Sequence, residues 1–233
     1  VELERLADFE TVHVGQEQVE QDDARLIVPD PGHGGFALGE HGGVEAPMPQ
    51  VFGQQFSGIA FVFDDKSGRL SANTPPLLQL KAGSWPRHLV TSPDNRFVYL
   101  LNELTATVTT LANENGLLKE VSSASALPPE STLRPGMPRP QPDRDVSNDV
   151  WASDIHVTPN GRFVYAAERT SSSIAAFSAD PATGKLTYLG STSTEKQPRG
   201  FRIGPAGRFM VVAGEKSDTI SSYRIESSGL LLH

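Results

Sequence analysis

An arginine and a glutamate, Arg87 and Glu103, stand sixteen residues apart in a stretch of short β-rich runs. If the residues between them form a hairpin of two short strands, this spacing brings both side chains to the same rim. A carboxylate at such a rim can act as a general base, and a guanidinium can stabilise charge on a substrate oxygen. A structural ion pair between two strands explains the same residues, so the spacing leaves both interpretations open.

Arg169 follows a predicted strand of a later repeat at the position that Glu103 has in its own repeat, as the pairs Asn102-Glu103 and Glu168-Arg169 show. Matching positions in successive repeats predict that both side chains lie at one rim. The planar guanidinium of an arginine suits a substrate carboxylate or phosphate. A salt bridge at the rim with Glu168 or Glu215 is the alternative.

Asp154 and His156 are two residues apart on a predicted strand, so both side chains should point to the same face. The pair suits proton transfer or phosphate binding, and hydrogen bonding between neighbouring sheets is an equal alternative. Arg199 takes the register of Arg87 in a later repeat, which predicts a second arginine that holds substrate. His88 directly follows Arg87, and strand alternation predicts that it points to the opposite face.

These residues lie in three segments that repeat one pattern, starting at Pro86, Ser153 and Pro198. Each segment carries a proline followed three residues later by an arginine. The last two prolines are 46 residues apart and the first two 66 apart, with a Pro-rich insertion at residues 127–143 between them. The prolines are Pro93, Pro159 and Pro205, and the arginines are Arg96, Arg162 and Arg208.

Each repeat reads as four short β-strands joined by turns, with no helical periodicity between them. A repeated antiparallel four-stranded unit of this length predicts an all-β fold of the β-propeller type, in which each unit is one blade. A parallel β-solenoid would show shorter repeats, and a sandwich would not repeat. The aromatic residues of the second strand are expected to fill the space between sheets; they are Phe97, Tyr99, Phe163, Tyr165 and Phe209.

An earlier blade is only partly legible, so we expect about four blades in one domain over residues 1–233. Residues 58–70 read as two outer strands, and the inner strands are expected near residues 24–29. Residues 1–57 match weakly and contain a Gly-rich loop at 32–43. Closed propellers usually have more blades, so the missing ones are expected from the rest of a longer chain or from another chain.

Composition excludes several classes of protein. A net charge of −8 argues against binding to nucleic acid. The chain has no cysteine, which excludes disulfides and thiolate metal sites. Since no run of eighteen apolar residues occurs, the sequence predicts no helical membrane span.

The ordered motifs resemble the bacterial 6-phosphogluconolactonase family of seven-bladed propellers, which includes fungal carboxymuconate-lactonizing enzymes. The resemblance runs from about residue 58 to residue 233. It is weaker before that point, where His13 lies a couple of residues off the register of a family histidine. The motifs are Trp85-Pro86-Arg87-His88, Asn102-Glu103-Leu104, Asp154-Ile155-His156, Arg169-Thr170 and Gln197-Pro198-Arg199-Gly200.

The resemblance implies a cytoplasmic hydrolase that opens an anionic sugar-acid lactone, without a metal or other cofactor, in the pentose phosphate route. It implies that Glu103 is the base, Arg87 the electrophilic partner and Arg169 a second active-site arginine. A carboxymuconate-type cyclisation and a non-catalytic binding scaffold are the alternatives. Convergence of the arginines predicts a locally positive channel mouth. The residues expected to bind substrate are His156, Asp154, Arg199 and His88.

Overall fold

The computed structural model describes residues 59–64, 69–114, 116–137 and 143–233. Within these ranges the regular structure consists of β-strands, and none of the described residues is helical. The all-β prediction is therefore confirmed for the described part of the chain.

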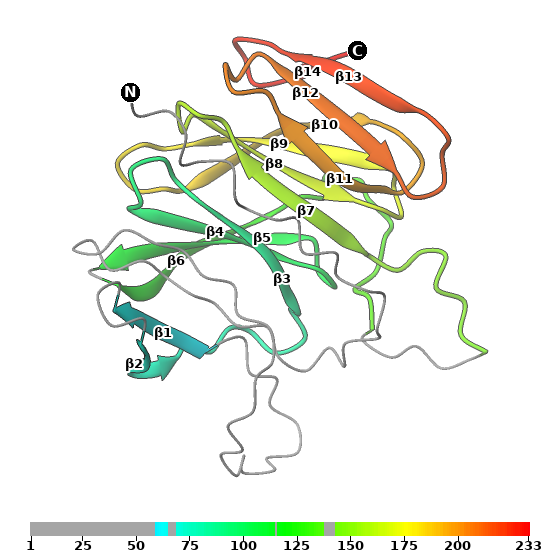
Figure 1. Ribbon diagram of the computed structural model, residues 1–233. Coiled ribbons are helices and arrows are strands. Elements are labelled where there is room, and N and C mark those ends of the chain that lie inside the picture. The colour runs from blue at the N-terminus through cyan, green and yellow to red at the C-terminus, as the bar shows by residue number, and fades with distance from the viewer. Residues whose placement is uncertain (1–58, 65–68, 115, 138–142) are drawn as a thin grey trace.

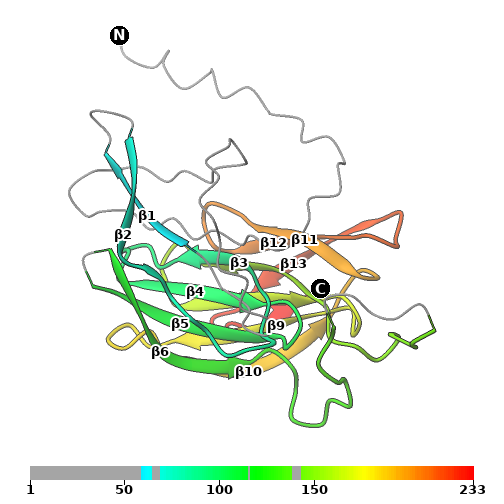
Figure 2. The ribbon, with the colours of Figure 1, turned by 90° about the horizontal axis from the view of Figure 1, so that it is seen from below.

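Three antiparallel four-stranded sheets follow one another in chain order, from the lower to the upper part of Figure 1, and Figure 2 shows them from below. The first contains β3 (Pro86–Thr91), β4 (Phe97–Asn102), β5 (Thr107–Glu114) and β6 (Leu117–Ser125). The second contains β7 (Ala152–Val157), β8 (Phe163–Glu168), β9 (Ser173–Ala179) and β10 (Leu186–Ser193). The third contains β11 (Pro198–Ile203), β12 (Phe209–Gly214), β13 (Ile220–Ile225) and β14 (Leu231–Leu232).

A further hairpin precedes these sheets. Strand β1 (Ile59–Asp64) pairs antiparallel with β2 (Arg69–Leu77), as expected for the outer strands of an earlier blade. The inner strands expected near residues 24–29, the Gly-rich loop at 32–43 and His13 lie outside the described residues. The source of further blades remains a prediction.

The same tight turn joins the first two strands of each sheet. Its left-handed residue is Asn95, Gly161 or Gly207, with φ of 58°, 72° and 65° respectively. Asparagine and glycine are the residues that tolerate this conformation. In the first sheet, Ser92 Oγ also donates to Asp94 Oδ1 at 2.6 Å. Local turn chemistry thus sets the repeated hairpin that starts each blade.

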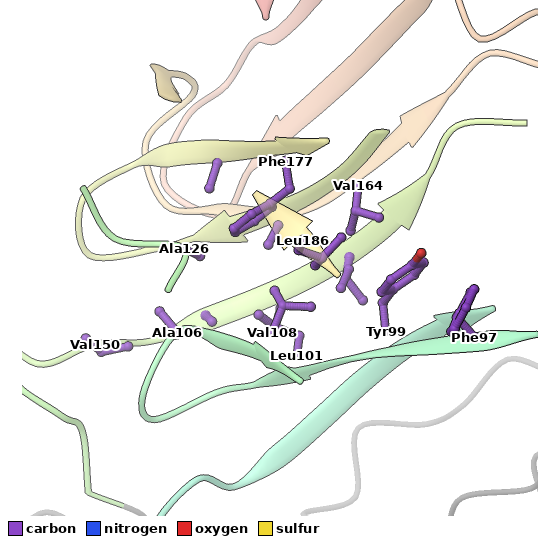
Figure 3. Close-up of a cluster of buried hydrophobic side chains, with 14 residues drawn as sticks. Phe97, Tyr99, Leu101, Ala106, Val108, Ala126, Val150, Val164, Phe177 and Leu186 are labelled. Carbon is purple, nitrogen blue, oxygen red and sulfur yellow. The ribbon is translucent and has the colours of Figure 1, made fainter. Parts of the chain in front are cut away.

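The hydrophobic core lies between neighbouring sheets (Figure 3). Tyr99 from the first sheet packs with Val164 and Phe177 from the second. Tyr165 belongs to an equivalent cluster between the second and third sheets. Burial of Phe97, Tyr99, Phe163 and Tyr165, four of the aromatic residues expected to fill the space between sheets, is confirmed.

The expectation for Phe209 is wrong, because its side chain is 54% exposed. Strand alternation directs the flanking Met210 and Val212 toward the second sheet and Phe209 to the other face of β12. On that face, Val211 and Ile220 are also exposed. Among the described residues no sheet covers this side, whereas the equivalent Phe163 packs against the third sheet.

The inner strand of each sheet carries a register irregularity at the end where the candidate residues lie. It falls between Pro86 and Leu89 in β3, between Ala152 and Ile155 in β7, and between Pro198 and Gly200 in β11. A bulge interrupts the alternation of side chains and re-aims them. These irregularities therefore decide where the side chains of residues 87, 88, 154 and 199 point.

No helix in the described ranges has the length and apolar character needed to cross a membrane.

Candidate functional site

The site lies where the inner strands begin and the second strands end, and the same backbone bond closes it in each sheet. The amide of Glu103 donates to the carbonyl of Trp85 at 2.8 Å, and the amide of Arg169 donates to the carbonyl of Trp151 at 3.0 Å. In the third sheet the amide of Glu215 donates to the carbonyl of Gln197 at 2.8 Å in the same way. Glu103, Arg169 and Glu215 are thus equivalent residues of successive blades.

Arg87 and Glu103 form the ion pair that their spacing predicts. Arg87 Nη1 lies 3.3 Å from Glu103 Oε1 and 3.2 Å from Oε2. The Glu103 side chain is 12% exposed, so the carboxylate is largely buried but still reaches solvent. The hairpin brings a potential base and a potential electrophile into contact.

Arg169 joins the same carboxylate from the second sheet. Its Nη2 donates to Glu103 Oε1 at 3.0 Å, and its Nη1 lies 3.6 Å from Glu215 Oε2. The guanidinium stacks over the Trp151 ring, 5.0 Å from its centroid. Burial lowers the pKa of Arg169, and the negative charge of Glu103 opposes this shift.

Arg199 extends the arrangement into the third sheet, where its Nη1 lies 3.4 Å from Glu215 Oε2. Its side chain is 57% exposed, against 12% for Arg169. Five side chains of alternating charge therefore form one row across three blades. This charged row runs in the order Arg87, Glu103, Arg169, Glu215 and Arg199.

His88 lies within the same polar region, contrary to the expectation from strand alternation. His88 as a whole residue is exposed. Desolvation of its imidazole by the surrounding protein lowers the pKa of His88, the charge of Arg87 adds to this shift, and Asp154 and Glu103 oppose it. The register shift between Pro86 and Leu89 provides the physical reason, because it breaks the alternation at His88.

Asp154 and His156 point to the same side, as predicted, and their Oδ2 and Nε2 atoms are 3.2 Å apart. Asp154 Oδ2 also accepts a hydrogen bond from the backbone amide of Phe201 in β11 at 3.1 Å. Burial raises the pKa of Asp154, but the hydrogen bond from His156 and further donors outweigh it, so the net shift is downward. The contact with Phe201 is a hydrogen bond between neighbouring blades, the alternative that the sequence left open.

The charged row contains three arginines and two glutamates. Asp154 pairs with His156 outside this row. A locally positive channel mouth remains a prediction. Arg199 is the most exposed arginine of the row, with 57% of its side chain exposed against 23% for Arg87 and 12% for Arg169. Within the described ranges, no group of three His, Cys, Asp or Glu side chains is placed to hold a metal ion.

Comparison with known proteins gives the family. A family model described as "Lactonase, 7-bladed beta-propeller" matches residues 59–233. The chain belongs to this lactonase family. The 6-phosphogluconolactonases of Sodalis glossinidius and Blochmanniella pennsylvanica are 38% identical over 167 residues and 36% identical over 162 residues. These matches cover 71% and 69% of this chain, respectively.

Solved structures agree with this assignment. The periplasmic gluconolactonase of Pseudomonas aeruginosa is 29% identical with a TM-score of 0.61, and the match covers 76% of this chain and 47% of that one. A Lactobacillus plantarum protein is 28% identical with a TM-score of 0.62, over 74% of this chain and 46% of that one. The chain spans about half the length of its curated lactonase relatives, 46% for the Sodalis protein and 44% for the Blochmanniella protein.

One residue of this lactonase-family site has no predicted role from the sequence. Trp151 Nε1 donates to Glu103 Oε1 at 2.7 Å, across 48 residues of sequence. Of the two salt-bridge partners that the sequence left open for Arg169, the structure pairs it with Glu215, while the buried Glu168 accepts from the amides of Trp151 and Ser171 at 2.7 and 2.6 Å. A tryptophan stands before the inner strand in two of three repeats, at positions 85 and 151, and this is the sequence signal that could have identified Trp151.

The Pro-rich insertion lies beside the site. The amide of Gly136 donates to the carbonyl of Leu104, the residue after Glu103, at 2.8 Å. Asp149, which follows the insertion, accepts at Oδ1 from Arg134 Nε at 2.6 Å and from Arg144 Nη2 at 2.9 Å. The described part of the insertion is thus held at the rim that carries Glu103.

Proposed function

We propose that this lactonase-family protein hydrolyses a sugar-acid δ-lactone, with 6-phosphogluconolactone as its substrate. The observation that carries the proposal is the unequal environment of the two Glu103 oxygens. Oε1 accepts from Trp151, Arg169 and Arg87, at 2.7, 3.0 and 3.3 Å. Oε2 has Arg87 alone among the described residues, at 3.2 Å. An ionised carboxylate offers about four lone-pair positions, so Oε2 keeps capacity for a water molecule.

The reaction follows from this arrangement. Glu103 Oε2 takes a proton from water while the water oxygen bonds to the lactone carbonyl carbon. The guanidinium of Arg87 stabilises the negative charge that develops on the carbonyl oxygen. The ring C–O bond then breaks, and the leaving oxygen takes the proton held by Glu103 to become a hydroxyl, which restores the carboxylate. The products are one carboxylic acid group and one alcohol on the same sugar chain.

Arg199 is the group that we assign to the substrate phosphate. It is the most exposed arginine of the charged row, and its contact with Glu215 is long at 3.4 Å. A guanidinium binds phosphate through paired N–H donors. Support for a phosphorylated substrate also comes from the curated relatives, which are named 6-phosphogluconolactonase. A cytoplasmic location is part of this proposal, and the Pseudomonas aeruginosa relative is called periplasmic.

The test compares two lactones in the full-length protein, followed as proton release in a pH-stat above the spontaneous rate. We expect 6-phosphogluconolactone to be hydrolysed with a higher kcat/KM than glucono-δ-lactone. We also expect Glu103→Gln to reduce kcat by roughly 100-fold or more, the usual scale for a general base, with little change in KM. If both lactones are hydrolysed only at the background rate, the proposal is contradicted and a non-catalytic binding scaffold is favoured. Full activity in a folded Glu103→Gln variant would remove Glu103 as the base.

A further inference from the structure

Trp151 contacts both charged partners at the centre of the row. Its indole N–H bonds Glu103 Oε1 at 2.7 Å, and its ring face carries the Arg169 guanidinium at 5.0 Å. We infer that Trp151 is a positioning residue that holds Glu103 and Arg169 so that Oε2 of Glu103 is the oxygen that acts on water. This inference rests on the proposed function and assigns a role to a residue outside the predicted site.

Because Trp151 donates to Oε1 of Glu103, Oε2 is the oxygen that remains available to water. Trp151 Nε1 makes the shortest bond to Oε1, ahead of Arg169 Nη2 at 3.0 Å and Arg87 Nη1 at 3.3 Å. A donor fixed on Oε1 prevents the carboxylate from exchanging its oxygens by rotation. Oε2 is thereby held on the side of Arg87, the group assigned to the developing oxyanion.

Backbone bonds hold Trp151 itself. Its amide donates to the buried Glu168 at 2.7 Å, and its carbonyl accepts from the amide of Arg169 at 3.0 Å. The next residue is tied as well, because the amide of Ala152 donates to the carbonyl of Glu103 at 2.9 Å. The indole therefore projects from a segment that is fixed to both residues that it positions.

The repeats show that the blade itself does not require this indole. Trp85 and Gln197 hold the equivalent places in the first and third sheets, as their carbonyl bonds with Glu103 and Glu215 show. Within the described residues the Trp85 indole donates to no side chain, and in the third sheet a glutamine replaces the aromatic ring. Of the three, Trp151 is the one whose side chain reaches a carboxylate.

Two substitutions separate the two contacts. Trp151→Phe removes the N–H but keeps an aromatic face for Arg169, so we expect kcat to fall about 10-fold or more while KM changes less than about 2-fold, the scale of one hydrogen bond to a charged group. Trp151→Leu removes both contacts and should raise KM as well. Trp85→Phe is the matched control and should change kcat less than about 2-fold.

A spectroscopic measurement tests the contact without depending on turnover. In protein labelled with ¹⁵N-tryptophan, Trp85→Phe and Trp151→Phe assign the two indole signals. Glu103→Gln should move the Trp151 indole proton signal strongly and that of Trp85 little, since only the former donates to the carboxylate.

The outcomes distinguish this inference from the proposed function. The positioning role would be overturned if kcat is unchanged in folded Trp151→Phe, or if the Trp151 indole signal does not move in Glu103→Gln. Neither result would contradict lactone hydrolysis. A loss of kcat that only follows a loss of folded protein, seen as melting temperature, would also overturn it. A wild-type protein without lactonase activity would contradict the proposed function, and the indole signal would still decide whether Trp151 binds Glu103.

Discussion

Glu103 and Arg169 occupy equivalent positions in two successive blades and bond to each other at 3.0 Å. Equivalent positions in a propeller meet at one rim, because each sheet is a rotated copy of the one before it. Opposite charges at these positions turn the repeat into an ion pair across 66 residues of sequence. Glu215 continues the alternation in the third sheet.

Arg87 should be required for the chemical step. Arg87→Ala is expected to lower kcat by roughly 100-fold, about 3 kcal/mol, the scale of losing one oxyanion donor. Arg87→Lys keeps the charge without the planar fork and should recover part of the loss. Steady-state kinetics and melting temperature are measured together. A kcat that stays at the wild-type value in a folded Arg87→Ala variant would rule out this role.

Arg199 should affect substrate affinity rather than turnover. We expect Arg199→Ala to raise KM for the phosphorylated lactone about 10-fold with kcat nearly unchanged, since an exposed anchor contributes to ground and transition states alike. The matched control is Arg224→Ala, because Arg224 makes an equally long 3.4 Å ion pair with Glu226 and is equally exposed. Equal KM values in the two variants would remove Arg199 as the anchor.

Arg169 has a different expected effect, because it lies between two carboxylates with a side chain only 12% exposed. Arg169→Ala would remove the cation that Glu103 and Glu215 share and leave each glutamate with one arginine partner, Arg87 and Arg199 respectively. We expect a loss of about 1–3 kcal/mol in the free energy of unfolding, together with a lower kcat. Urea unfolding measures the first effect. If Arg169→Ala raises KM alone and leaves stability unchanged, the result would instead favour Arg169 as a residue that only binds substrate.

Gly229 should be needed for packing between the second and third sheets. A Cβ at this position would lie 2.5 Å from the ring of Phe163, and φ is 89°. Gly229→Ala is expected to cost about 2 kcal/mol or more through overpacking and backbone strain. Gly83→Ala is the control, since φ is 80° there and no side chain or backbone atom of the described residues, its chain neighbours aside, lies within 4 Å of the added Cβ. Equal losses in the two variants would show that contact with Phe163 does not matter.

Asp94 should give a small acid-dependent contribution to stability. Hydrogen bonds from Ser92 and then Arg96 lower the pKa of Asp94 from 3.8 to about 2. The stabilisation is therefore present above the pKa of the unfolded chain and disappears as the pH falls through about 2. Its side chain is 50% exposed, so solvent screening should keep the contribution below about 1 kcal/mol.

Asp94→Asn tests this contribution, and the second blade shows that the turn tolerates it, because Asn160 accepts from Thr158 and Arg162 in the same way. Wild type and variant should differ slightly near pH 7 and converge below pH 2 in thermal unfolding. A difference that persists at low pH would contradict the assignment.

The sequence by itself determined the local structure. Turn residues and alternating apolar positions act over a few residues, so the hairpins, the repeats and the Arg87–Glu103 pair across one hairpin were predictable. The family resemblance added Arg169 to the site. The equivalence of residues 103 and 169 was also visible, because the repeat itself is a sequence property.

The tertiary structure decided the contacts between blades. Trp151 meets Glu103, and Asp154 meets the amide of Phe201, only when neighbouring sheets pack at a particular distance and angle. Because of the register shift in β3, the His88 side chain does not follow the simple alternation of strand faces. Exposure of Phe209 likewise depends on whether a sheet covers its face. Side-chain periodicity records which face of a strand a residue takes, but not which group it meets there, because that depends on the packing of elements far apart in the chain.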